Sequence, residues 1–389
     1  MTPKETRKPY LDFYKEHKIS PVPNHGLTAR LINSRRSLYG HLNISKNSIR
    51  DRDVLEFGPG NGTNSLYTMS LKPRSYRLVD ANPTGLKNCR ANFEKSFPNE
   101  NWELHDSRIE LYSDRKTYDL VICEGFVPNQ IEPISMAKHC ASFVAPGGLL
   151  IVSCHDPVSL ISENLRAFIG TLLISPRDTF ETRVRKLSRF FIKDLKALGT
   201  NTRNIEDWVI DNILNSEFWK LAPLFSMEEA VQTLQENFVV FGSSPAFIVD
   251  WEWYKSIEEF ETHANTRFIE SYRSNIHNLL DTRNWSEPVD FPKNKEILEL
   301  CCELRETIAK TSEQNPAAQN NLLLKQVITL SSKLACVVKT QSATTAASLS
   351  DLICGLEKYQ KTGEIKEHYF TEFRQWWGRG MQYMTFEKI

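Results

Sequence analysis

Short apolar runs alternate with amphipathic segments along the first 155 residues of the chain. Five such runs are recognisable, of which the third is the weakest: 53–57, 76–80, 101–106, 118–124 and 147–154. The segments between them repeat their apolar residues at the three-to-four spacing of a helix. Continuous apolar strands separated by helices are typical of a parallel sheet covered on both faces. This part of the chain is therefore predicted to be an α/β domain.

The alternation stops after residue 155. Residues 157–236 have a helical pattern, a strand is predicted at 238–244, and residues 256–378 are again mainly helical before an alternating β pattern at 381–388. Two interpretations follow. In the first, the two late strands pair antiparallel at one edge of the sheet, so that both helical blocks are insertions. In the second, the C-terminal block is a separate helical domain with an incidental strand. We favour the first.

Composition narrows the class of protein. The 389 residues include 48 basic and 48 acidic side chains, and this balance disfavours nucleic acid as a partner because such binders normally carry a basic excess. The eight cysteines show no zinc spacing, so no metal site is predicted and reduced, buried thiols are expected. The charged N-terminus lacks a signal-peptide pattern, and no apolar run approaches the length of a membrane span. A cytoplasmic location is expected.

A glycine loop follows the first predicted strand, with the sequence Gly-Pro-Gly-Asn-Gly at 58–62. A strand, a glycine turn and a helix present backbone N–H groups and a positive helix end to a polar or anionic ligand. The dinucleotide fingerprint would require a third glycine where Thr63 stands, which disfavours a nicotinamide enzyme. Glu56 and Asp80 end neighbouring strands, where carboxylates suit ribose hydroxyls. Asp106 ends the third strand and would either bind an adenine amino group or cap a helix.

Four successive motifs, LEFGPGNGTNSL, LVDANP, YDLVICEGF and APGGLLIVS, resemble those of the class I S-adenosylmethionine (SAM)-dependent methyltransferases over residues 50–155. The resemblance implies a Rossmann-like seven-stranded sheet with an antiparallel last strand beside the sixth, SAM as cofactor and S-adenosylhomocysteine as its product. The predicted organisation is a helical lead-in or lid (1–50), a SAM-binding core (51–156), a helical insertion (157–236), the sixth strand and following segment (237–255), a second helical insertion (256–378) and the last strand (379–389).

The resemblance also implies a cofactor site at the carboxyl ends of the strands. The glycine loop would approach the methionine part of SAM, Asp80 would bind the ribose, and Glu124 would line the methyl-transfer side. The residues assigned to the cofactor by position in the motifs are Glu56, Gly58, Pro59, Gly60, Gly62, Asp80, Ala81, Asn82, Asp106, Ser107, Glu124 and Gly125.

Candidates for the remaining chemistry come from outside the glycine loop. His155, directly after the fifth strand, is the candidate general base with Asp156 beside it, and the alternative is that His155 bonds a loop carbonyl. Candidates for the acceptor pocket are His25, Arg36, Tyr39, Trp251 and Arg379.

Two further patterns carry alternative interpretations. The basic segment 183–196 is expected to be the solvated face of an amphipathic helix, and the alternative is a site for an acidic acceptor. The aromatic clusters at 250–254 and 376–380 are expected to be core beneath the insertions, and the alternative is that they wall an acceptor pocket.

The leading hypothesis is a SAM-dependent methyltransferase that transfers a methyl group to oxygen or nitrogen of a small-molecule or sugar-like acceptor. Two large helical insertions suit an enclosed site better than a long polymer, and no Asn-Pro-Pro-Tyr-like tetrapeptide follows the fourth strand. The alternatives are a non-catalytic binding or regulatory protein on the same fold, and a different group transfer from SAM. The aromatic content of the helical blocks is compatible with a homodimer.

Overall fold

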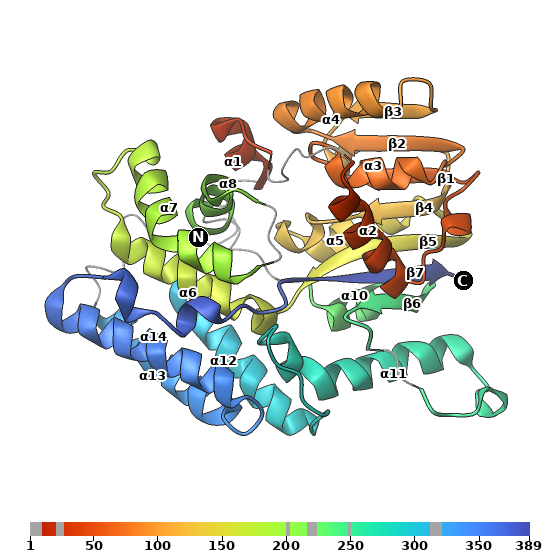
Figure 1. Cartoon of the computed structure of the whole chain (residues 1–389). Coiled ribbons are helices and arrows are strands. Elements are labelled where there is room, and N and C mark those ends of the chain that lie inside the picture. The colour runs from red at the N-terminus through yellow and green to blue at the C-terminus, as the bar shows by residue number, and fades with distance from the viewer. Residues whose placement is uncertain (1–9, 21–26, 200–202, 216–223, 248–249, 312–320) are drawn as a thin grey trace, which may run out of the picture. The chain divides into compact units, whose positions relative to one another are not determined.

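The computed structural model describes residues 10–20, 27–199, 203–215, 224–247, 250–311 and 321–389 (Figure 1). The chain divides into two compact units. The first comprises residues 1–155, 223–272 and 381–389, and the second comprises residues 156–222 and 273–380.

The first unit is built on a seven-stranded sheet. In chain order its strands are β1 (Asp53–Phe57), β2 (Ser75–Asp80), β3 (Trp102–Asp106), β4 (Tyr118–Cys123), β5 (Val144–His155), β6 (Phe238–Ser244) and β7 (Met381–Lys388). Their order across the sheet is β3-β2-β1-β4-β5-β7-β6. The predicted class, a Rossmann-like α/β sheet of seven strands, is confirmed.

The last strand settles the choice between the two interpretations of the C-terminal block. β7 pairs antiparallel with β5, from Leu149 opposite Glu387 to His155 opposite Met381, and it pairs antiparallel with β6 on its other side. Figure 1 shows it in blue between the yellow β5 and the green β6. The strands from β1 to β5 pair in parallel. The paired-strand interpretation is therefore correct, and the terminal strand is part of the sheet.

Burial explains why some strands were easier to recognise than others. Leu55 of β1, Val121 of β4 and Ile151 of β5 are completely buried, as expected for central strands covered on both faces. β3 lies at the edge of the sheet, and none of its residues is fully buried. The weak apolar signal of β3 therefore matches its low burial, which β6 at the other edge does not share.

Helices cover the sheet of the first unit. Their bounds are α1 (Tyr10–His17), α2 (Ala29–His41), α3 (Thr63–Ser70), α4 (Pro83–Ser96), α5 (Pro133–Ala141), α10 (Met227–Leu234) and α11 (Phe260–Asn275), with short 3₁₀ turns η2 (Lys46–Ser48), η3 (Ile109–Leu111), η4 (Val127–Asn129) and η6 (Tyr254–Ser256). The start of α4 shows why the chain becomes helical there: the Asn82 side chain accepts a hydrogen bond from the backbone N–H of Thr84, and Pro83 occupies the first turn.

The second unit is helical in its described residues. Its elements are α6 (Pro157–Leu173), α7 (Phe180–Ala197), α8 (Ile205–Val209), the π-helical turn η5 (Ile210–Leu214), η7 (Ile276–Leu279), α12 (Phe291–Ala309), α13 (Asn321–Val338), α14 (Ala343–Thr362), η9 (Glu367–Tyr369) and η10 (Phe373–Gln375). α12 packs against α6 and α13, and α13 packs against α14. By length and composition α13 is the one helix in the described part of the chain that could cross a membrane, and 44% of it is buried.

A buried ionic cluster joins three segments of the second unit. The Asp194 carboxylate of α7 bonds Arg166 of α6 at 3.1 Å and also bonds Arg374. The Arg166 guanidinium stacks 3.9 Å from the ring centroid of Trp377. Trp376 and Trp377 are both buried, so the expectation that the 376–380 cluster belongs to the core is confirmed for these two residues.

Candidate functional site at the carboxyl ends of the strands

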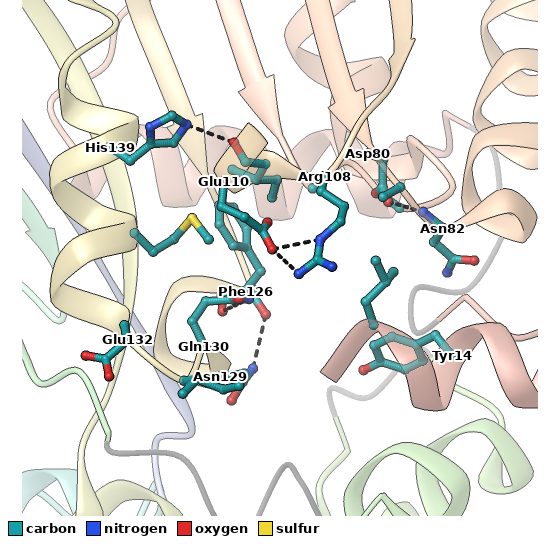
Figure 2. A pocket seen from close by; sticks show the side chains of 18 of the residues that line it. Tyr14, Asp80, Asn82, Arg108, Glu110, Phe126, Asn129, Gln130, Glu132 and His139 are labelled. Carbon is teal, nitrogen blue, oxygen red and sulfur yellow. Dashed lines mark hydrogen bonds and ion pairs between the residues drawn. The ribbon is translucent and has the colours of Figure 1, made fainter. Parts of the chain in front are cut away.

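A cavity of about 540 Å³ lies at the carboxyl ends of β1, β2 and β4, within the first unit (Figure 2). Its volume is within the range of small-molecule sites in proteins. Open α/β sheets bind their ligands at this end of the strands. The lining residues are Leu11, Tyr14, Gly58, Gly60, Asp80, Ala81, Asn82, Arg108, Ile109, Glu110, Glu124, Gly125, Phe126, Asn129, Gln130, Ile131, Glu132, Ser135, Met136 and His139.

The glycines after β1 serve two different purposes. Gly58 and Gly60 line the cavity with positive φ angles of 66° and 58°, and a Cβ at Gly58 would lie 2.9 Å from the Phe126 ring. Gly62 does not line the cavity. Its φ is 74°, and a Cβ there would lie 2.6 Å from Cys89 Sγ, so Gly62 permits α3 and α4 to pack closely.

Asp80 is the most clearly positioned polar group of the cavity. Its Oδ2 accepts the Gly60 N–H at 2.9 Å and its Oδ1 accepts the Asn82 N–H at 2.8 Å. Burial raises the pKa of this carboxyl, and the backbone N–H groups of Asn82 and Gly60 act in the opposite direction. Each carboxylate oxygen has a further lone pair. Asp80 can therefore accept two more hydrogen bonds from a ligand in the cavity.

The segment after β3 reaches the cavity through residues 108–110. Arg108 Nε donates to Glu110 Oε1 at 2.8 Å, and both side chains lie at the cavity in Figure 2. Asp106 is exposed and Ser107 donates its N–H to the Asp80 carbonyl at 3.0 Å. Neither of these two lines the cavity. The structure thus places Arg108 and Ile109 where the sequence assigned Asp106 and Ser107.

The segment after β4 contributes Glu124, which is held by an arginine from α2. Arg35 donates to the two carboxylate oxygens of Glu124 at 2.8 and 2.6 Å, and to the hydroxyl of Tyr39 at 3.3 Å. Burial alone would lower the pKa of Arg35, but the Glu124 carboxylate outweighs that effect and holds it well above its usual value. The adjacent Gly125 donates its N–H to Ser153 Oγ at 2.8 Å. Both cavity residues are therefore fixed by buried partners.

A family model described as a methyltransferase domain matches residues 33–198, which include the glycine loop, Asp80 and Glu124. Residues 33–198 therefore form a methyltransferase domain of the class I SAM-dependent type. It is similar over 190 residues, at 24% identity, to a tRNA U34 carboxymethyltransferase of Nautilia profundicola, a match that covers 44% of this chain and 61% of that protein. It is also 26% identical over 145 residues to a ubiquinone biosynthesis O-methyltransferase of Coxiella burnetii, covering 37% of this chain and 56% of that protein.

Among solved structures, the N-methyltransferase NodS of Bradyrhizobium japonicum with bound S-adenosyl-L-homocysteine is 12% identical, with a TM-score of 0.31. That match covers 37% of this chain and 74% of NodS. The two curated relatives are matched over only 61% and 56% of their own lengths, so the likeness concerns the methyltransferase domain and not the whole of those proteins.

Not every residue that the sequence motifs assign to the cofactor lines the cavity. Gly58, Gly60, Asp80, Ala81, Asn82, Glu124 and Gly125 do, whereas Glu56, Pro59, Gly62, Asp106 and Ser107 do not. The Glu56 carboxylate is buried and accepts hydrogen bonds from Ser65 Oγ, at 2.9 Å, and from the Tyr76 hydroxyl. Burial raises its pKa to about 7.

The candidate general base lies elsewhere in the structure. His155 is 2% exposed at the end of β5 and does not line the cavity; its backbone N–H donates to the Phe225 carbonyl at 2.9 Å. Asp156 caps α6, with Oδ1 accepting the Val158 N–H at 2.7 Å. A capping role explains the conformation of Asp156, and a catalytic role for either residue stays a prediction.

The residues predicted for the acceptor pocket are not brought together at the cavity. Tyr39 is buried, with its hydroxyl 2.7 Å from Thr68 Oγ1. Arg36 is exposed, and Trp251 is 94% exposed. Arg379 belongs to the second unit and donates to the Asn278 carbonyl at 2.7 Å. His25 lies outside the described residues.

The aromatic cluster at 250–254 is not part of the core, because Trp251, Trp253 and Tyr254 are all exposed. The expectation of burial was wrong there.

The sequence analysis missed the largest group of lining residues, which lies between β4 and the end of α5. Phe126, Ile131 and Met136 supply apolar surface, and Asn129, Gln130, Glu132, Ser135 and His139 supply polar groups. His139 Nε2 lies 2.8 Å from the Ile109 carbonyl and donates to it, so the two walls of the cavity are bonded to one another (Figure 2). The rule that ligands bind beyond the carboxyl ends of strands could have extended the site past Gly125.

Proposed function

We propose that this protein is a SAM-dependent methyltransferase that acts on a small, uncharged or cationic molecule bearing hydroxyl or amine groups. The observation that carries the proposal is the position of Asp80 in the cavity, with its two carboxylate oxygens oriented by backbone N–H groups and able to accept further hydrogen bonds.

The residues of the cavity fit the nucleoside part of SAM. Asp80 matches a ribose diol, because two adjacent hydroxyls can donate to one carboxylate. Ile109, Phe126 and Met136 give apolar surface of the kind that an adenine ring contacts. Gly58 and Gly60 leave the backbone accessible where a side chain would take up space.

When bound, SAM would supply an electrophilic methyl group, so the task of the protein is to orient the reactants and exclude water. Asp80 would fix the rotation of the ribose, and Glu124 would face the ligand with its carboxylate held in plane by the two hydrogen bonds from Arg35. Fixed geometry of this kind can supply about 7–11 kcal/mol of a bimolecular barrier.

The charge of the cavity supports the choice of acceptor. Among the described residues, four carboxylates line it, from Asp80, Glu110, Glu124 and Glu132. Glu110 is bonded to the Arg108 guanidinium and Glu124 to that of Arg35, so the lining is acidic even after these two pairs are counted. An acidic cavity repels polyanions such as RNA and favours hydrogen-bond donors. Asn129 and Gln130 add amide groups that can bond hydroxyls.

A second candidate is the transfer of a carboxymethyl group, which is the activity printed in the name of the Nautilia profundicola relative. Arg108 would then have a second carboxylate to bind, since its guanidinium lies at the cavity. A sulfonium analogue carrying carboxymethyl in place of methyl tests this. It should bind more tightly than SAM and lose that advantage in Arg108→Ala if carboxymethyl is the transferred group.

The cofactor is tested by calorimetric titration of the full chain with SAM, S-adenosylhomocysteine and NAD. Micromolar binding of the two sulfur ligands and none of NAD is expected. Asp80→Ala removes two charge-assisted hydrogen bonds to the ribose and should weaken binding about a hundredfold. Asp106→Ala tests the neighbouring strand end and should leave affinity unchanged, as should the surface control Glu299→Ala on α12.

Two results would contradict the proposal. Tight NAD binding, or no binding of either sulfur ligand by the wild-type protein, would remove the cofactor assignment. Binding without any release of S-adenosylhomocysteine across a panel of hydroxyl and amine acceptors would favour the non-catalytic alternative.

A further inference from the structure

Four large aromatic side chains are exposed together in a segment of the first unit between β6 and α11. Trp251 is 94% exposed, Tyr254 72%, Trp253 63% and Phe260 57%. We call residues 250–260 the aromatic tip. None of its residues lines the cavity. Exposed aromatic groups gathered in one segment are typical of a binding surface. Exposed apolar residues elsewhere on protein surfaces are usually scattered singly.

The aromatic tip is held in place by its own carboxylates. Asp250 Oδ2 lies 2.5 Å from His263 Nε2, and Glu252 Oε2 lies 3.2 Å from the Arg267 guanidinium, with both partners on α11. Asp250 Oδ1 also accepts the Glu252 N–H at 2.9 Å. The alternate residues Trp251 and Trp253 carry none of these bonds. Asp250 and Glu252 thus fix the segment against α11, while the indole rings of Trp251 and Trp253 stay exposed.

Asp250, Glu252 and His263 also form a group that could hold a metal ion, with one ligand atom from each within 4.8 Å of the others. His263 directs Nε2 to Asp250 at 2.5 Å and Nδ1 to Glu252 at 3.9 Å. The two carboxylates are exposed, and each is already paired with a side chain of α11. Ion pairing with α11 accounts for the arrangement.

The charge of the aromatic tip selects the chemistry of its partner. Acidic residues predominate from 250 to 261, namely Asp250, Glu252, Glu258, Glu259 and Glu261, against the single Lys255. Lys255 Nζ lies 4.9 Å from the Trp253 ring centroid and 5.9 Å from that of Tyr254, so these rings already accept a cation. The surface therefore suits a partner that presents lysine or arginine side chains.

This chain presents such a surface on α7. The helix buries Leu187, Phe190 and Phe191 on one face, which confirms the expected amphipathic helix. Its exposed face carries the basic residues Arg185, Lys186, Arg189, Lys193 and Lys196. Lys186 and Lys193 are paired with Asp178 and Glu367. Arginine stacks on indole rings more readily than lysine does, which makes Arg185 and Arg189 suitable partners for tryptophan.

We propose that the aromatic tip of one copy of this chain binds the basic face of α7 on a second copy. The acidic charge of the aromatic tip favours the basic face of α7 over other possible partners. Tip-to-tip contact would bring acidic segments together, and an anionic lipid surface or a nucleic acid would be repelled. Trp251 and Trp253 are the anchors, because ordered tryptophans lose little conformational entropy on binding and dominate interface energies.

Sedimentation velocity of the full chain tests this contact between about 1 and 100 µM protein, at 50 and 500 mM NaCl. Concentration-dependent association is expected at low salt, and it should weaken at high salt because exposed charges are screened. Trp251→Ala and Trp253→Ala should each weaken association at least tenfold. Trp285→Ala is the matched control, since Trp285 is 68% exposed in the second unit and lies outside the aromatic tip.

Charge exchange identifies the α7 side of the contact. Glu258→Lys with Glu259→Lys should abolish association, and so should Arg185→Glu with Arg189→Glu, whereas a mixture of these two variants should associate again. These side chains are all exposed, and circular dichroism with SAM titration confirms that each variant is folded. Tip variants should bind SAM as the wild type does, so failure of this proposal is distinguishable from failure of the proposed function.

Three outcomes would overturn the proposal. The first is a monomer at every concentration. The second is association that ignores salt and both tryptophan substitutions. The third is a monomer that binds phosphatidylcholine vesicles through Trp251 and Trp253, which would make a lipid surface the occupant.

Discussion

Glu56 offers the sharpest test of the electrostatics around the glycine loop. It is a buried carboxyl on β1, bonded by the Ser65 hydroxyl at 2.9 Å and by the Tyr76 hydroxyl, and burial raises its pKa from 4.5 to about 7. Glu56→Gln replaces it with a neutral group of the same shape. The amide oxygen can still accept from Tyr76, and the amide nitrogen can donate to Ser65 Oγ.

The magnitude follows from the two pKa values. A carboxyl whose pKa is higher in the folded protein stabilises the fold fully below its unfolded value of 4.5, and that stability is lost as the pH rises through about 7. At about 1.4 kcal/mol for each pH unit, the wild-type protein should lose about 3 kcal/mol relative to Glu56→Gln between pH 4.5 and pH 8. The free-energy difference between variant and wild type isolates this group from others that titrate in the same range.

The assay is urea denaturation at several pH values, followed by hydrogen exchange of peptides from β1 and α3 so that the transition belongs to the first unit. Glu299→Gln is the control, because Glu299 is an exposed acid on α12, outside the first unit. A difference between wild type and Glu56→Gln that stays constant from pH 4.5 to 8 would refute the reasoning, and one that grows in the opposite direction would show that Glu56 is stabilised as a carboxylate.

Two further predictions concern packing and buried charge. Gly62→Ala should destabilise the first unit by about 1–3 kcal/mol more than Gly147→Ala, as measured by urea denaturation. Both glycines have a positive φ, but only the new methyl at 62 would meet another side chain, Cys89 Sγ at 2.6 Å. Equal losses for the two variants would mean that backbone strain alone sets the cost. Asp194→Asn removes the carboxylate that bonds both buried arginines, Arg166 and Arg374, and should cost about 3–5 kcal/mol in the second unit. Glu367→Gln breaks the more exposed pair with Lys193 and should cost under about 1 kcal/mol. Equal losses for the two variants in thermal denaturation would contradict this prediction.

The strands and the glycine loop could be predicted from the sequence because their signals are local. An apolar run bounded by turn residues predicts a buried strand, and each of the seven observed strands lies at or within a residue or two of an expected one, except that β5 extends from Val144. Asp80 was predictable for a related reason. A carboxylate at the end of a parallel strand lies at the ligand-binding edge of the sheet wherever the strand itself is correctly recognised.

For the neighbouring acids Glu56 and Glu124, the sequence did not predict which way the side chain points or which residue bonds it. Glu56 lies one position before the end of β1, yet its carboxylate bonds Tyr76 and Ser65 in the core and does not reach the cavity. Glu124 reaches the cavity, but its partner Arg35 is 89 positions away in sequence. Successive residues of a strand point to opposite faces, so an error of one position in assigning a face reverses the role of a side chain.

The sequence by itself thus determined the order of the elements, the class of the sheet and the backbone loop at the ligand-binding edge. Tertiary structure decided which aromatic groups are covered: Trp376 and Trp377 are buried, whereas Trp251 and Trp253 in a similar aromatic cluster are exposed. It also decided that residues 126–139 form a wall of the cavity. The physical reason is that local periodicity is encoded over a few residues, while burial depends on the sum of weak contacts with segments that lie far away in the chain.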